Sequence, residues 1–262
     1  MIALPSQALI GVIHLPPLPG SPRHQLPMEE IARRAADDAA ALEAAGFDAA
    51  IIENYGDAPF FGQCVPPVTV ASMSVVADAV RRAGGLRLGI NVLRNDPGSA
   101  LAIAVAVDAA FIRVNVHAGV YATDQGLIEG AAADTLRLRR SLQARVAVLA
   151  DVHVKHARPV SHDDLVAAAE DTAYRGLADG LIVTGSATGK EVDPEHVRLI
   201  RQAVPDRRLF IGSGATAETV ADLLALAGSV IVGSSIKYDG LPENQVDPER
   251  AHAFSRAAGR PV

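Results

Sequence analysis

Eight short apolar runs, each followed by an alanine-rich or amphipathic stretch, constrain the fold of this 262-residue chain more than any other feature. Runs rich in Val and Ile predict buried strands, and apolar residues recurring every three or four positions predict helices. The expected strands are 10–15, 49–53, 86–92, 111–116, 146–152, 180–184, 209–212 and 229–233. The expected helices are 29–45, 70–83, 99–107, 125–143, 163–175 and 216–226, and two more that open at Asp193-Pro194-Glu195 and Asp247-Pro248-Glu249.

This regular succession of strand and helix predicts an α/β fold, a single (β/α)8 TIM barrel made by residues 1–262 as one domain. The chain length is typical of such a barrel, and the nearly continuous apolar strands suit a parallel sheet that helices cover. A doubly wound open sheet is the alternative. It fits less well because no linker or change of composition marks a second domain.

Composition narrows the classes of partner and compartment. A formal net charge of -6 argues against nucleic acid as a partner. The single cysteine cannot form an internal disulfide, and the apolar N-terminus lacks the basic segment of a signal peptide. No run of about 18 apolar residues is free of charge and proline, so no membrane span is expected. We therefore expect a cytoplasmic protein, whose alanine-rich helices suit either packing on the barrel or a homo-oligomer.

The stretch ADVHVKHA, residues 150–157, places three ionisable groups directly after an apolar strand. If the strand continued, its alternation would put Asp151, His153 and Lys155 on one face and the valines on the other. TIM barrels carry their active sites at the carboxyl ends of the strands, where this stretch is expected. The three lysines of the sequence all fall at this end: Lys155, Lys190 and Lys237.

One interpretation of ADVHVKHA is a divalent metal site. Asp151 and His153 are suitable ligands, and Glu53 or His117 could complete the set. Two ligands from one strand do not make a site, so the sequence implies no cofactor with certainty.

Two other interpretations are compatible with each other. Lys155 could form a Schiff base if burial or nearby cations lower its pKa, and Asp151 or His153 could act as a general acid or base. Asp151 could also pair with Arg113, because a buried guanidinium needs a carboxylate partner.

Further catalytic candidates follow other strands at the same end. Glu53 ends the second strand and is either an acid of the site or a partner of Arg113. His14 is either catalytic or a core histidine bonded to the backbone. The full candidate set is Asp151, His153, Lys155, Glu53, Asn115, His117 and His14.

Glycine-rich turns after the last three strands predict a phosphate site. Barrels often bind phosphate after strands seven and eight, where glycines let the backbone approach the anion. The predicted phosphate-binding residues are Gly185, Ser186, Gly212, Ser213, Gly214, Gly233, Ser234 and Ser235. The stretch that ends at Lys190 is not a Walker motif, because Glu191 stands where Ser or Thr is required. The alternative is that these are small turn residues at a crowded rim.

Long motifs distributed over residues 10–254 give the chain a family resemblance. They are IGVIHLPPLPGSPRH, ENYGDAPF, RVNVHAGVYATDQGLIEG, ADVHVKHA, VTGSATGK, GSGAT and VGSSIK. With these motifs the chain resembles the BtpA family, which includes the SgcQ-type proteins of sugar operons. The resemblance implies a barrel related in outline to phosphate-binding barrels. The best-known member is linked to photosystem I biogenesis in cyanobacteria, and the family carries over no settled reaction.

Two functions follow as hypotheses. The first is an enzyme that binds a small phosphorylated ligand, a sugar phosphate or phosphoribosyl compound, with acid/base chemistry at the barrel mouth. A lyase of the aldolase type, an isomerase and a glycosyl-cleaving enzyme all remain open. The second is a non-enzymatic assembly or stability factor that uses the barrel as a scaffold and exposes an apolar patch to its partner.

Overall fold

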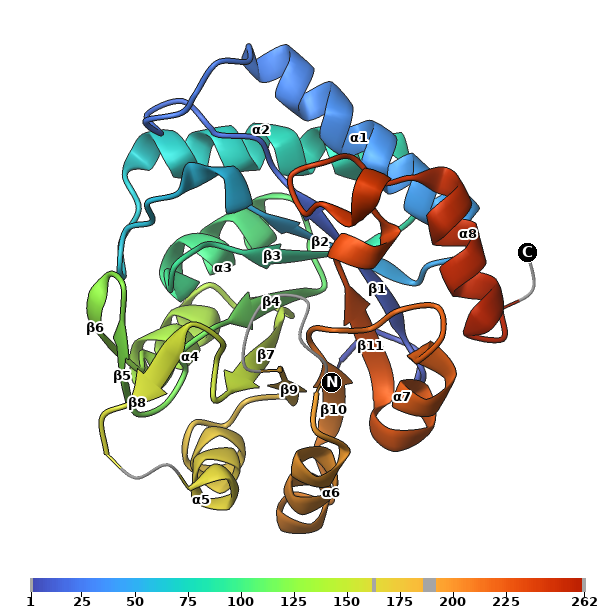
Figure 1. The fold of residues 1–262 in the computed structure, drawn as a ribbon. Coiled ribbons are helices and arrows are strands. Elements are labelled where there is room, and N and C mark those ends of the chain that lie inside the picture. Colours follow the sequence, from blue (N-terminus) through green and yellow to red (C-terminus); the bar gives the residue numbers. More distant parts are fainter. Residues whose placement is uncertain (1, 162–163, 186–191, 261–262) are drawn as a thin grey trace.

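The fold is a closed barrel of eight parallel strands (Figure 1). The computed structural model describes residues 2–161, 164–185 and 192–260. The barrel strands are β1 (Leu9–His14), β2 (Ala49–Glu53), β3 (Arg87–Asn91), β4 (Phe111–Val114), β7 (Ala147–Val152), β9 (Gly180–Val183), β10 (Arg208–Ile211) and β11 (Gly228–Val232). Their order is β1-β11-β10-β9-β7-β4-β3-β2, and the ring closes because β1 pairs with both β2 and β11. The predicted TIM barrel is confirmed.

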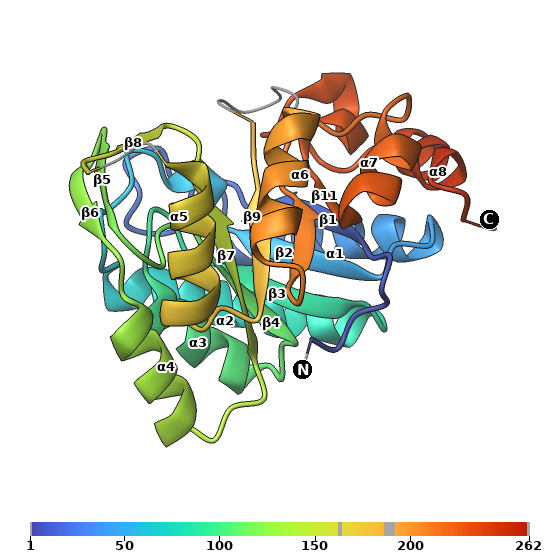
Figure 2. The same cartoon turned by 90° about the horizontal axis from the view of Figure 1, so that it is seen from below.

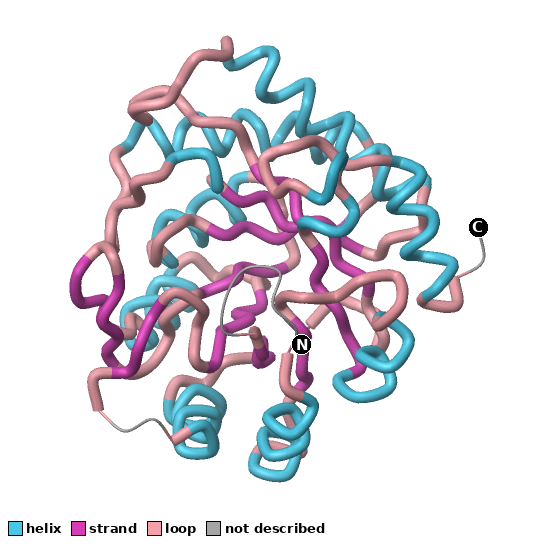
Figure 3. The backbone as a smooth tube through the Cα atoms, in the orientation of Figure 1, coloured by secondary structure: helices cyan, strands magenta, loops and turns pink. Residues whose placement is uncertain are grey.

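Helices surround the strands on all sides (Figure 3). They are α1 (Met28–Ala44), α2 (Pro67–Ala83), α3 (Pro97–Ala106), α4 (Ala132–Ser141), α5 (Leu165–Glu170), α6 (Pro194–Ala203), α7 (Val220–Ala227) and α8 (Pro248–Ala257). The two helices predicted to open at Asp-Pro-Glu, α6 and α8, do begin there. Asp193 and Asp247 each accept a hydrogen bond from a backbone N–H in the first turn of the helix that follows. No helix within the described ranges has the length and apolarity needed to cross a bilayer.

Two apolar layers stabilise the barrel. The larger lies between the strands and the helices, and the smaller fills the barrel interior with side chains such as Phe111 and Phe210. The Phe111 ring occupies the space beside Gly89, where an added Cβ would lie 2.2 Å from a ring carbon. Glycine at this position is therefore a requirement of core packing.

The predicted helix 125–143 is wrong at its start. Residues 120–129 form a hairpin of β5 (Val120–Thr123) and β6 (Gly126–Glu129), and the short strand β8 (Ala157–Pro159) extends it to three strands. The hairpin buries Tyr121 and Ile128 together with Val116 and Val154, so tertiary packing outweighs helix propensity here. Figure 2 shows this small sheet at the end of the barrel opposite the N-terminus.

The predicted alternation along ADVHVKHA also fails beyond its third residue, Val152. Strand β7 ends at Val152, and His153 adopts a left-handed backbone with φ 51°. The chain leaves the sheet at that point, so Asp151, His153 and Lys155 do not share a strand face.

Candidate functional site

A pocket of about 1070 Å³ opens at the carboxyl ends of the barrel strands. Loops that follow β1, β2, β3, β4, β7, β10 and β11 all contribute to its wall. The predicted site residues that line it are His14, Glu53, Asn115, Lys155, Gly212, Ser213, Gly214, Gly233, Ser234 and Ser235. Most of the set therefore converges on one cavity, at the end of the barrel where the sequence placed it.

Below this pocket, a buried polar network joins β4 to β7. Arg113 donates two hydrogen bonds to Asp151, from Nε at 3.2 Å and from Nη2 at 3.0 Å. Asn115 donates a third, at 3.0 Å, and accepts one from Asn91. Both carboxylate oxygens of Asp151 are thus occupied, which confirms the predicted pairing of Asp151 with Arg113. Asp151 positions Arg113 and Asn115, and those two residues reach the pocket.

Glu53 is the buried acid of the pocket, with 8% of its surface exposed. Burial raises the pKa of its carboxyl, and the cations of Arg113 and Lys155 oppose that rise only in part. A raised pKa favours the protonated form of Glu53, which is the form that can donate a proton to a bound ligand.

Lys155 extends into the same pocket from the loop after β7. Burial lowers the pKa of its ammonium group, and the nearby Arg113 guanidinium lowers it further. The Lys155 carbonyl accepts a hydrogen bond of 2.6 Å from Arg94, which ties the loop to the residues after β3. A lowered pKa favours the neutral amine, which is the form that attacks a carbonyl carbon.

His14 stands at the end of β1 beside Glu53. Its Nδ1 donates to the carbonyl of Pro242 at 2.8 Å, and its Nε2 lies 3.8 Å from Glu53 Oε1. The ring packs against Tyr55 with centroids 4.5 Å apart. Burial and the charge of Lys237 lower the pKa of His14 to about 3, so the imidazole is neutral near pH 7.

The turns predicted to bind phosphate form one continuous wall. The Ser235 hydroxyl donates to the Ala215 carbonyl at 2.7 Å, which joins the turn after β11 to the turn after β10. Gly214 has φ 73°, a left-handed conformation that favours glycine. A Cβ at Gly233 would lie 3.1 Å from His14 Cε1, so this glycine lets the turn approach the imidazole.

Gly185 and Ser186 complete the predicted phosphate set. The Gly185 N–H donates to the Ser213 hydroxyl at 2.8 Å, so Gly185 supports the turn after β10 from behind the pocket wall. Ser186 and Lys190 lie outside the described residues.

Two histidines of the predicted set lie away from the pocket. His117 donates from Nε2 to the Gly176 carbonyl at 2.8 Å and lines a separate cavity of about 750 Å³. The rings of His153 and Tyr121 lie in a T-shaped arrangement, with centroids 6.3 Å apart. In the described part of the chain, no three His, Cys, Asp or Glu side chains gather as a metal site. The geometry thus gives the metal interpretation of Asp151 and His153 no third ligand.

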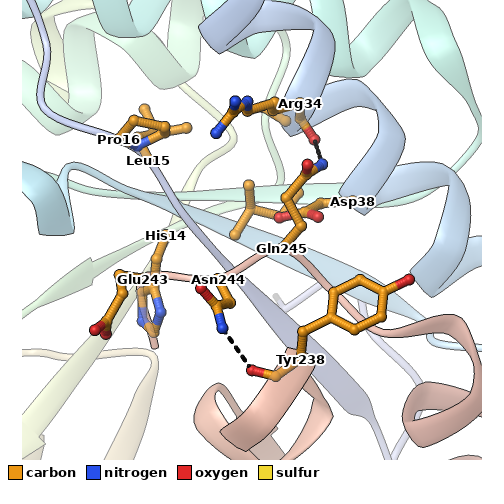
Figure 4. Close-up of a pocket in the computed structure, with 11 residues that line it drawn as sticks. His14, Leu15, Pro16, Arg34, Asp38, Tyr238, Glu243, Asn244 and Gln245 are labelled. Carbon is orange, nitrogen blue, oxygen red and sulfur yellow. Dashed lines mark hydrogen bonds between the residues drawn. The ribbon is translucent and has the colours of Figure 1, made fainter. Parts of the chain in front are cut away.

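The prediction placed Lys237 at the mouth, but its ammonium group does not line the pocket. It is fully buried and pairs with Asp38 of α1 at 3.3 Å. Asp38 lines a smaller cavity of about 310 Å³, whose wall also includes residues 13–16, Tyr238 and residues 243–245 (Figure 4). No local feature of the sequence marks the loop of residues 238–245 as part of the site, because Pro242 and His14 are 228 positions apart.

Comparisons with known proteins agree with this architecture. The model of the BtpA family matches residues 5–260. The photosystem I biogenesis protein BtpA of Synechocystis is 49% identical over 249 residues, covering 95% of this chain and 87% of that protein. An uncharacterized protein of Thermococcus kodakarensis is 47% identical over 250 residues, covering 95% of this chain and 94% of that one.

Among solved structures, one similar fold is (S)-3-O-geranylgeranylglyceryl phosphate synthase from Thermoplasma acidophilum, determined with sn-glycerol-1-phosphate. Its TM-score is 0.62 at 18% identity, and the match covers 96% of this chain and 93% of the synthase. At that identity the likeness concerns the fold alone. The family match, in contrast, extends over nearly the whole chain, and this protein belongs to the BtpA family.

Proposed function

We propose that this protein is an enzyme that acts on a small phosphorylated ligand, a sugar phosphate or a phosphoribosyl compound. The turns at 212–214 and 233–235 bind the phosphate, and His14, Glu53 and Lys155 act on the carbon skeleton. One observation carries the proposal: both sets of residues line the same pocket.

The position of the two turns supports a phosphate site. They follow the seventh and eighth barrel strands, where TIM barrels commonly bind phosphate with backbone N–H groups. The synthase of similar fold was determined with a glycerol phosphate, which is consistent with this assignment. Arg94 and Arg113 add positive charge to the pocket wall, which favours an anionic ligand.

Proton transfer at or beside a carbonyl or anomeric carbon is the chemistry that these side chains support best. Glu53 can donate a proton, neutral His14 can accept one, and Lys155 can attack a carbonyl as an amine. An aldolase-like lyase, an isomerase and a glycosyl-cleaving enzyme use these groups in different combinations.

A thermal-shift screen of the intact protein tests the proposal. The panel holds inorganic phosphate, glyceraldehyde 3-phosphate, ribose 5-phosphate, AMP and MgCl₂. A ligand at 100 times its dissociation constant stabilises the folded state by about 2.7 kcal/mol, so binding is easily seen. Ser234→Asp places a carboxylate in the phosphate wall and should abolish the shift. Ser141→Asp, on the exposed end of α4, is the matched control and should retain it. A shift that survives Ser234→Asp, or silence across the panel, contradicts the phosphate site.

The second candidate is an assembly factor, favoured by the 49% identity to a photosystem I biogenesis protein. It needs an exposed apolar surface, and Val75 on α2 and Leu177 after α5 are more than half exposed. Arginine substitutions at both positions distinguish the two functions. They should weaken capture of a partner complex and leave ligand-induced stabilisation unchanged.

A further inference from the structure

The loop from Lys237 to Asp247 decides which nitrogen of His14 carries the proton. Because the Pro242 carbonyl can only accept, the proton of the neutral ring must reside on Nδ1. The lone pair of the ring then resides on Nε2, which is the nitrogen nearer to Glu53. Tyr55 on one side and Gly233 on another leave the ring little freedom to turn over.

The spacing between His14 and Glu53 suits a ligand atom between them. A separation of 3.8 Å exceeds a hydrogen bond, so the two groups do not neutralise each other directly. Both line the main pocket, and a ligand placed at their edge can contact both at about 3 Å.

A buried clamp holds the base of this loop. Lys237 Nζ lies 3.3 Å from Asp38 Oδ2, and Asp38 Oδ1 accepts a hydrogen bond of 2.8 Å from the Val246 N–H. One carboxylate therefore joins both ends of the loop to α1. Lys237 and Asp38 are 0% and 4% exposed, and a buried pair resists separation because either charge alone is costly.

Two backbone bonds and two side-chain bonds complete the loop. Tyr238 donates to the Gln245 carbonyl at 3.1 Å, and Asp247 donates to the Ile236 carbonyl at 2.9 Å. Figure 4 shows the Asn244 side chain directed at the Tyr238 carbonyl and the Gln245 side chain at the Arg34 carbonyl. The tip that carries Pro242 is thus supported from within the loop and from α1.

We propose that residues 237–247 form a positioning loop, whose Lys237–Asp38 clamp holds Pro242 against His14 so that Nε2 accepts a ligand proton while Glu53 donates one. The catalytic part of this role rests on the proposed function.

In the proposed step, a C–H bond beside a ligand carbonyl breaks and its proton goes to His14 Nε2. The electron pair of that bond forms a carbon–carbon double bond, and the carbonyl oxygen takes the Glu53 proton. The products are an enol, an imidazolium and a carboxylate. Lys237, Asp38 and Pro242 are positioning residues.

Nitrogen-15 NMR of the histidine rings in the intact, ligand-free protein tests the positioning role. His14→Gln assigns the His14 signal, and wild-type His14 should show a protonated Nδ1 and an unprotonated Nε2. A double variant, Lys237→Met with Asp38→Asn, removes both charges of the clamp and leaves no buried ion. His14 should then change to the mixed tautomers expected of an exposed ring such as His196.

An internal control is available on α8. His252 Nδ1 also donates to a proline carbonyl, that of Pro248, at 2.8 Å, and its signal should not change. If the double variant does not fold, Pro242→Gly, which frees the loop tip and spares the clamp, decides the question by the same measurement. A wild-type ring protonated on Nε2, or an unchanged tautomer in a folded variant, overturns the proposal. Because no ligand is present, this result does not depend on whether the phosphate site exists.

Discussion

Arg113 and Asp151 face each other across adjacent strands β4 and β7, joined by two hydrogen bonds with side chains 4% and 0% exposed. Asp151→Asn should lower the free energy of unfolding by about 3–5 kcal/mol, because it leaves a buried guanidinium without a counter-charge. Urea denaturation measures the change. Asp37→Asn, which breaks an exposed pair with Arg33 on α1, should cost less than about 1 kcal/mol. Equal losses in the two variants would show that water reaches the buried pair.

Lys155 should react as an amine at neutral pH. Incubation with glyceraldehyde 3-phosphate forms an imine with loss of water, and borohydride reduces that imine to a stable adduct. Mass spectrometry should locate the adduct on Lys155, since burial and Arg113 lower the pKa of this ammonium group. Lys155→Met should lose the adduct and retain the thermal shift with inorganic phosphate. An equally modified Lys155→Met protein rules out the Schiff base at this position.

Stability should depend on pH through His14 and Glu53 in opposite senses. The pKa of His14 falls from 6.5 to about 3 on folding, so its contribution is lost as pH falls below 6.5. Each pH unit of that window is worth about 1.4 kcal/mol. Burial raises the pKa of Glu53 above 4.5, so its contribution is lost as pH rises above 4.5.

The two slopes oppose each other from pH 4.5 upwards, over the part of the His14 window in which Glu53 also titrates, which makes single substitutions informative. Glu53→Gln should steepen the acid loss of stability in that range, and His14→Gln should remove it. The cations of Lys237, Lys155 and Arg113 lower the pKa of His14 in addition to burial, and so add to its resistance to protonation. Urea denaturation at pH 4.5, 5.5 and 6.5 gives the slopes. Parallel slopes for all three proteins would contradict the assignment.

Gly89→Ala should destabilise the barrel by about 1–3 kcal/mol, because the added Cβ would overlap the Phe111 ring. Gly62→Ala is the control, since its Cβ would meet no atom closer than 3.8 Å. Thermal unfolding should show a lower midpoint for Gly89→Ala alone. If the two variants unfold together, the ring has moved aside at little cost.

The sequence was sufficient to predict the barrel for a physical reason. Each parallel strand is buried on both faces, so it appears as a short apolar run such as Ala49–Glu53, bounded by glycines and polar residues. Barrel geometry then brings the strand ends together, which is why Glu53, Asn115 and Lys155 could be predicted to meet.

Features that depend on distant contacts could not be predicted. The hairpin at 120–129 was interpreted as helix because its burial partners, Val116 and Val154, belong to other segments. Its signal was the short turn at Asp124-Gln125 before Gly126, whose φ is 95°. Nothing local marks Pro242 as the partner of His14 or Asp38 as the partner of Lys237, because these contacts cross most of the chain.

Because β1 pairs with β11, the barrel cannot close until β11 has been synthesised. The strand and loop that complete the surroundings of His14, β11 and Pro242, leave the ribosome more than 210 residues after His14. A nascent chain holding β1 to β10 has an open sheet, whose unpaired edges are prone to associate with other chains. A chain that terminates between β10 and Pro242 would therefore contain His14 and Glu53 but lack the carbonyl that accepts the hydrogen bond of His14 Nδ1.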